Sequence, residues 1–173
     1  MIWPIVICAL WGIAVAGIGA GLTSLTPWYY ALRKPSWQPP DWLFGPAWSV
    51  ILTLASASAY FAWRDAATDA QRLLVVVLFV VNGVLNIVWS PLFFRWRRPD
   101  WALIEVPFLW LSILVPIIAL APISRAASLL MVPYLIWVSF AAVLNIAVVR
   151  LNRPFGPAAE NRVRGPMARH ELR

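Results

Sequence analysis

Residues 73–94 read LLVVVLFVVNGVLNIVWSPLFF, a stretch without one charged side chain. A bilayer core about 30 Å thick is crossed by roughly 20 apolar residues in an α-helix, so this stretch is long enough to span a membrane. Outward from it the chain holds four more long charge-free runs, which are residues 1–32, 42–63, 106–124 and 126–149. The sequence therefore predicts an all-α membrane protein, a bundle of five transmembrane helices.

The composition agrees with this fold class. Of 173 residues, 62% are hydrophobic and 12% are charged, whereas a soluble domain carries about 25% charged residues. The first run lacks a basic start and is too long for a signal peptide, so we expect a permanent helix there. One transmembrane domain is expected over 1–152 and a basic, flexible tail over 153–173. Its helices are expected at about 2–25, 42–64, 72–94, 101–123 and 126–150, with a lid loop over 26–41.

The basic residues predict an orientation. With five spans, eleven of the fourteen Lys and Arg residues fall on the side of the 26–41 loop and the C-terminus. The positive-inside rule therefore places the C-terminus in the cytoplasm and leaves inner versus outer membrane open. Because topology accounts for the net charge of +7, we expect the lipid bilayer and no nucleic acid as a partner.

Few side chains suit catalysis or metal binding. One cysteine, Cys8, and one histidine, His170, exclude disulfide frameworks and zinc sites of ordinary spacing. We expect Glu105 in the first turn of the fourth helix, which leaves no acid or base deep in any span. Proton relays and coupled pumps need such groups, so the sequence does not favour active transport. No metal site and no required cofactor are predicted, and an enzyme is not favoured.

Three spans each carry a face on which aromatic or amide side chains recur every three or four positions. Such spacing puts side chains on one side of a helix. If the three faces meet, they form a flat-walled apolar pocket with a few polar groups. A plain aromatic core, with the amides bonding neighbouring helices, is the alternative. The faces are Phe44 and Trp48; Asn82, Asn86 and Trp89; and Tyr134, Trp137, Ala141 and Asn145.

The loop between the first two spans is the least generic stretch. Residues 26–46 read TPWYYALRKPSWQPPDWLFGP, and the prolines after Trp28 restrict the backbone. This rigid, aromatic segment also carries Arg33 and Lys34. We interpret it as a lid at the membrane surface.

The pattern Trp-Tyr-x-x-Leu-x-Lys-Pro-x-Trp-x-Pro-Pro-x-Trp-x-Phe-x-Pro-x-Trp, from Trp28 to Trp48, resembles the signature of the tryptophan-rich sensory protein/translocator protein family (TspO/MBR, the peripheral-type benzodiazepine receptors). NIVWSPLFF at 86–94 and VPYLIWVSFAAVLN at 132–145 support the resemblance, which covers roughly 10–152. It implies a five-helix bundle, usually a homodimer, that binds porphyrins, sterols and drug ligands in a pocket closed by the first loop. Small residues on the first helix, such as Gly12 and Ala16, suit either a dimer seam or packing within the chain.

The resemblance also implies which side chains face a ligand. Animal members end the fifth helix with a cholesterol-recognition pattern centred on Tyr, and Ile146 stands at that place here, so a sterol is disfavoured as the main ligand. The implied ligand-binding residues are Trp37, Trp42, Phe44, Trp48, Asn82, Asn86, Trp89, Tyr134, Trp137, Ala141 and Asn145.

A porphyrin suits these residues best. Its flat ring stacks between indoles, and Arg33 and Lys34 would bind its propionates. Haem needs an axial ligand, but Cys8 and Met131 lie off the aromatic faces, so we expect metal-free protoporphyrin to bind better. The leading hypothesis is a receptor, sensor or carrier for such ligands. The alternatives are light-driven porphyrin degradation through Trp48 or Trp137 and a structural scaffold without a ligand.

Overall fold

A computed structural model of the protein describes residues 2–156. Five helical segments in that range are long and apolar enough to cross a membrane, which confirms the predicted fold class. Most of the predicted basic tail, from residue 157 on, lies outside the described residues. The helices are α1 (Trp3–Leu22), α2 (Pro27–Ala31), α3 (Asp41–Asp65), α4 (Asp69–Ser90), the π-helical η1 (Pro91–Arg95), α5 (Pro99–Leu120), α6 (Arg125–Leu130) and α7 (Val132–Asn152).

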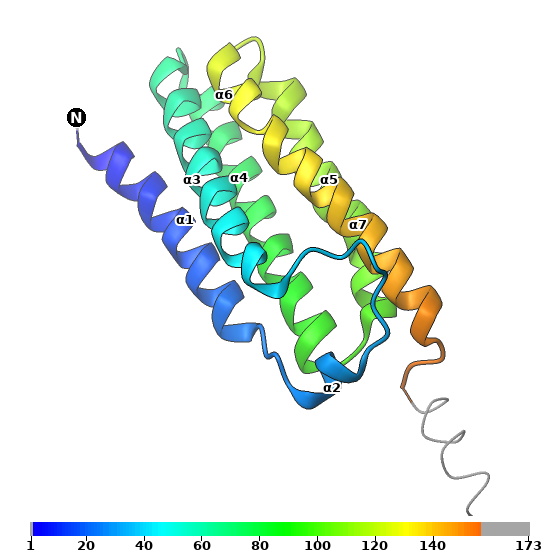
Figure 1. The fold of residues 1–173 in the computed structure, drawn as a ribbon. Coiled ribbons are helices and arrows are strands. Elements are labelled where there is room, and N and C mark those ends of the chain that lie inside the picture. Colours follow the sequence, from blue (N-terminus) through cyan, green and yellow to red (C-terminus); the bar gives the residue numbers. More distant parts are fainter. Residues whose placement is uncertain (1, 157–173) are drawn as a thin grey trace, which may run out of the picture.

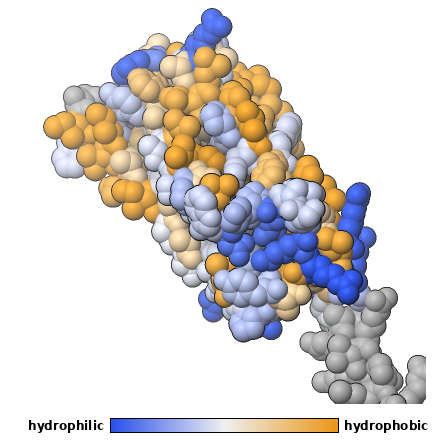
Figure 2. All heavy atoms as spheres, in the orientation of Figure 1, coloured by the Kyte–Doolittle hydropathy of each residue, from blue (hydrophilic) through white to orange (hydrophobic). Residues whose placement is uncertain are grey.

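The long helices lie side by side in one bundle, and the segment containing α2 crosses one end of it from α1 to α3 (Figure 1). α1 packs on α3 and α4, while α5 packs on α4 and α7. Figure 2 shows apolar side chains over much of the visible bundle and hydrophilic side chains gathered near the crossing segment. We refer to residues 26–40 as the lid and to this end of the bundle as the lid end.

Small residues decide how closely α1 approaches its neighbours. A Cβ atom at Gly83 of α4 would meet the Trp11 Nε1 atom at 2.8 Å, so only glycine leaves room for this indole. The same Nε1 atom donates a hydrogen bond to the Phe79 carbonyl at 3.0 Å. Gly12 lies against Ser56 of α3, whereas a Cβ atom at Gly17 would find open space. Gly12 therefore serves packing within the chain.

The fifth span differs from the predicted single helix over 126–150. It is divided at Met131 into α6 and α7. Pro133 is the second residue of α7, where its missing N–H and fixed φ are tolerated at a helix start. A proline at this position favours a new helix start over an unbroken span.

The predicted place of Glu105 is wrong. α5 begins at Pro99, two residues earlier than expected, because proline suits the first helical position. Glu105 therefore lies beyond the first turn, and only 8% of it is exposed. Neither of its carboxyl oxygens has a hydrogen-bond partner. An acidic side chain thus lies inside the bundle.

Candidate ligand-binding site

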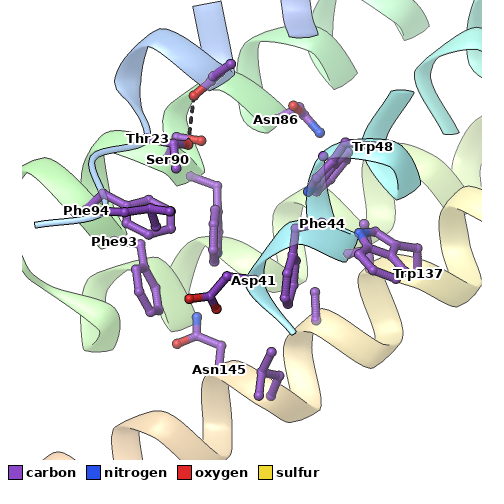
Figure 3. Close-up of a pocket in the computed structure, with 18 of the residues that line it drawn as sticks. Thr23, Asp41, Phe44, Trp48, Asn86, Ser90, Phe93, Phe94, Trp137 and Asn145 are labelled. Carbon is purple, nitrogen blue, oxygen red and sulfur yellow. Dashed lines mark hydrogen bonds between the residues drawn. The ribbon is translucent and has the colours of Figure 1, made fainter. Parts of the chain in front are cut away.

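A cavity of about 530 Å³ lies at the lid end of the bundle, among α1, the lid, α3, α4, η1, α5 and α7 (Figure 3). Sites for small molecules commonly measure about 300–1,000 Å³. Its walls are mostly apolar or aromatic, and polar side chains are few. The cavity therefore has the size and character of a site for an apolar small molecule.

Aromatic rings form two walls. Phe44 and Trp48 of α3 meet Trp137 of α7 edge to face, with ring centroids 5.7 and 6.5 Å from that of Trp137. On the opposite side, Trp89 of α4 stacks on Phe93 of η1 at 5.1 Å. Figure 3 shows the first three rings facing Phe93 across the cavity. The faces predicted on three separate helices thus meet around one space.

Two asparagines bring amides to the cavity wall, and each is held in place. The Asn86 Nδ2 donates a 2.6 Å hydrogen bond to the Tyr134 hydroxyl behind the wall. The Asn145 amide, oriented to satisfy both neighbours, donates to the Pro99 carbonyl at 3.1 Å and accepts from the Leu103 N–H at 3.2 Å. Both asparagines therefore join helices while facing a potential ligand.

The structure divides the predicted site residues into two groups. Eight of them line the cavity: Lys34, Phe44, Trp48, Asn86, Trp89, Trp137, Ala141 and Asn145. The others do not line it: Arg33, Trp37, Trp42, Asn82 and Tyr134.

The second group lies outside the cavity for identifiable reasons. Trp42 is two residues from Phe44 on α3, on nearly the opposite helix face, and it is 71% exposed. Trp37 packs its ring against Phe140 of α7 at 6.0 Å and remains 47% exposed. Asn82 donates to the Ser112 hydroxyl at 3.0 Å and joins α4 to α5. Tyr134 lies behind Asn86, to which it is hydrogen-bonded, and so does not line the cavity.

Arg33 ties the lid to α7 through its backbone. The Asn152 side chain donates to the Arg33 carbonyl and accepts from the Arg33 N–H, each at 2.8 Å. This amide pairs with the lid backbone as a neighbouring strand would. The Arg33 backbone therefore holds the lid in place. Arg33 is an exposed residue and does not line the cavity.

Charged and hydroxyl groups gather where the lid meets the cavity, and the sequence reasoning missed most of them. The Tyr29 hydroxyl donates to Asp41 Oδ1 at 2.8 Å, and the Gln38 amide donates to the same oxygen at 3.2 Å. Lys34 Nζ lies 3.6 Å from Asp41 Oδ2 and 3.6 Å above the Tyr29 ring centroid. Burial and the bond to Asp41 raise the pKa of Tyr29 well above its ordinary value, so the phenol stays protonated. All four side chains line the cavity.

The signal for these residues was present in the sequence. Gln38 and Asp41 flank the Pro39–Pro40 pair, whose rigid backbone aims both side chains toward Tyr29. On α1, the small residues Ala16, Gly19 and Ala20 also line the cavity. The spacing of Ala16 and Ala20 predicted close packing of this helix, and part of the space that these small residues leave is the cavity.

Comparisons with known proteins agree with these motifs. The TspO/MBR family model matches residues 4–151. The tryptophan-rich protein TspO of Chlorobaculum tepidum is 39% identical over 140 residues, covering 78% of this chain and 89% of the relative. The human translocator protein is 32% identical over 126 residues, covering 72% and 75%. The tryptophan-rich sensory protein of Cereibacter sphaeroides is 31% identical over 152 residues, covering 88% and 94%.

Proposed function

The chain belongs to the TspO/MBR family, and on that premise we propose that it is a membrane receptor, sensor or carrier for a planar, porphyrin-like ligand. It is an integral, multi-pass membrane protein. The observation that carries the proposal is the cavity at the lid end, where Phe44, Trp48 and Trp137 face Phe93. Trp89 stacks on Phe93 and also lines the cavity. The names of the relatives, a translocator and a sensory protein, are consistent with a ligand that is moved or sensed.

A flat macrocycle matches the chemistry of these walls. Each well-placed contact between aromatic rings contributes about 0.5–1.5 kcal/mol beyond the burial of apolar area. The amides of Asn86 and Asn145 supply polar contacts at the ring edge. Lys34 supplies a cation for a carboxylate at the lid end. A drug-like aromatic molecule would use the same walls, whereas a sterol has no π-face to stack.

The ligand expected here is metal-free. Among the described residues, those that line the cavity include no His, Cys or Met, which are common axial ligands of haem iron. Tyr29 does line it, but a phenol kept protonated by burial and by Asp41 is a poor iron ligand. We therefore propose that protoporphyrin binds more tightly than haem.

We also propose that the lid end faces the cytoplasm and that the protein forms a homodimer. Seven of its basic residues that the structure describes, including those next to η1 and α7, lie toward this end of the bundle. The positive-inside rule places such an end in the cytoplasm. Protease accessibility of the lid in oriented vesicles tests the orientation, and light scattering of the purified protein tests the dimer.

Titration of the protein in lipid nanodiscs with protoporphyrin tests the ligand. We expect saturable quenching of tryptophan fluorescence, with a smaller quenched amplitude in Trp48→Phe and Trp137→Phe. Trp42→Phe is the matched control, because this exposed ring lies outside the cavity lining and its loss should leave the binding curve unchanged. A scaffold without a ligand would show no saturable quenching by any tetrapyrrole.

The position of two indoles in the cavity wall supports a second candidate function, light-driven porphyrin degradation. Trp48 and Trp137 both line the cavity, so a porphyrin bound there would lie against both indoles, which could then donate an electron to it. Irradiation of the bound complex should then yield less product in Trp137→Phe than in the wild type. An unchanged yield removes that tryptophan from the chemistry.

A further inference from the structure

Among the described residues, the charged side chains that line the cavity are Lys34 and Asp41, and these two face each other. Lys34 Nζ and Asp41 Oδ2 are 3.6 Å apart, and the two side chains are 22% and 30% exposed. Charge-assisted hydrogen bonds of this kind are usually about 2.7–2.9 Å long, so the pair is a loose one. An incoming carboxylate therefore meets a cation that is partly neutralised by a loose ion pair and rests on the Tyr29 ring.

Asp41 has hydrogen-bond partners other than Lys34. Its Oδ1 atom accepts hydrogen bonds from the Tyr29 hydroxyl and from the Gln38 amide. It also lies in the first turn of α3, where a negative charge is stabilised by the helix dipole. If Lys34 turns to another anion, Asp41 keeps these interactions. The geometry thus permits an exchange of partners at Lys34 without leaving a buried carboxylate unpaired.

The rest of the cavity offers no second place for an anion. Beyond the lid end, its lining in the described part of the chain is apolar, aromatic or neutral polar. Burying a carboxylate there without a cation would be strongly unfavourable. A ligand whose carboxylates all lie on one edge avoids that cost, because this edge stays beside Lys34.

We propose that Asp41 competes with the carboxylate of the ligand for Lys34, and that this competition sets how strongly the cavity prefers a ligand with a carboxylate over a neutral ligand of the same shape. Asp41 is a specificity-determining residue in this scheme, since it weakens binding of every ligand that needs Lys34. The inference deepens the proposed function and rests on it.

The experiment compares protoporphyrin with its dimethyl ester, which has the same ring without the charges. Both are titrated against the full chain in nanodiscs, using the wild type and the variants Asp41→Asn and Lys34→Gln. Asparagine keeps an oxygen for Tyr29 and Gln38 but gives up the charge. We expect Asp41→Asn to tighten protoporphyrin binding about three- to tenfold and Lys34→Gln to weaken it by about the same factor. Binding of the ester should change less than twofold in either variant.

The double variant separates competition from simple repulsion. If Asp41 acts through Lys34, the gain from Asp41→Asn should shrink to less than twofold in the Lys34→Gln background. An equal gain with and without Lys34 would mean that Asp41 only repels the ligand, and the competition would be refuted.

Asp100→Asn is the matched control. Asp100 also lies in the first turn of a transmembrane helix at the lid end and pairs with Arg98 at 2.6 Å, but it does not line the cavity. Asp100→Asn should leave the affinities for protoporphyrin and for its ester unchanged, and a gain equal to that of Asp41→Asn would attribute the effect to overall charge.

The ester also separates the two proposals. If the wild type binds neither protoporphyrin nor the ester, the proposed function fails. If it binds both and the variants at Lys34 and Asp41 change nothing, only the competition fails. A variant that still binds the ester has an intact cavity, so misfolding is recognised.

Discussion

Asn152→Ala should loosen the lid. The Asn152 side chain makes two hydrogen bonds of 2.8 Å to the backbone of Arg33, and these tie the lid to the end of α7. A hydrogen bond within a protein contributes about 0.5–1.5 kcal/mol net, and exposed ones lie at the low end. Loss of both should therefore cost lid closure about 1–2 kcal/mol. This corresponds to a roughly 5- to 30-fold rise in the open population, since 1.4 kcal/mol is about a factor of ten.

The assay is hydrogen exchange of the lid amides in nanodiscs, which requires no ligand. Exchange of the Arg33 amide and its neighbours should accelerate by the factor above, because exchange of a protected amide follows its open population. If a porphyrin is bound, its dissociation should speed up by a similar factor. Asn152→Asp tests the two hydrogen bonds separately, since aspartate still accepts from the Arg33 N–H but cannot donate to the Arg33 carbonyl.

Thr68→Ala serves as the control. Thr68 caps α4 at the opposite end of the bundle and accepts from the Gln71 N–H at 3.2 Å, so its loss costs a comparable amount without touching the lid. Unchanged lid exchange in Asn152→Ala, with normal folding, would refute the idea that this side chain holds the lid closed. Equal acceleration in Thr68→Ala would show that the effect reflects global stability.

Three further predictions concern packing and ligand choice. Gly83→Ala should lower the free energy of unfolding by about 1–3 kcal/mol, because its Cβ would lie 2.8 Å from Trp11 Nε1; Gly17→Ala, with open space around it, should not, and thermal unfolding in detergent compares the two. Ser58→Ala should cost about 1 kcal/mol in the same assay, since the buried Ser58 hydroxyl donates to the Ala127 carbonyl at 2.7 Å; no change would mean that this bond does not hold α6 on α3. Haem should bind more weakly than protoporphyrin in parallel titrations, because the cavity lining offers no common axial ligand for iron. Equal affinity would contradict this prediction.

The transmembrane helices were predictable because their cause is local. Twenty or so apolar residues in a row partition into lipid whatever surrounds them, so charge-free length located each span. The same holds for the lid, whose prolines restrict the backbone residue by residue. The ends of the helices were harder to predict. α5 starts at Pro99 rather than at Trp101, and this shift carried Glu105 from the first turn into the interior.

Helical spacing correctly assigned side chains to faces but said nothing about depth. Asn86 lines the cavity while Tyr134, its hydrogen-bond partner, lies behind the wall. Both belong to the inward faces predicted from spacing. Which one reaches the cavity depends on how far each helix stands from its neighbours, and this is a property of the packed bundle.

The lid shows the same division. The sequence by itself determined a rigid, aromatic, basic segment beside a five-helix membrane bundle, because hydrophobic length and proline geometry act within one stretch of chain. Only the tertiary structure decided that Lys34 enters the cavity while Arg33 ties the lid to Asn152, and that Asp41 faces Lys34. Neighbouring residues in an irregular loop point wherever their partners on other helices hold them, and those partners are distant in sequence.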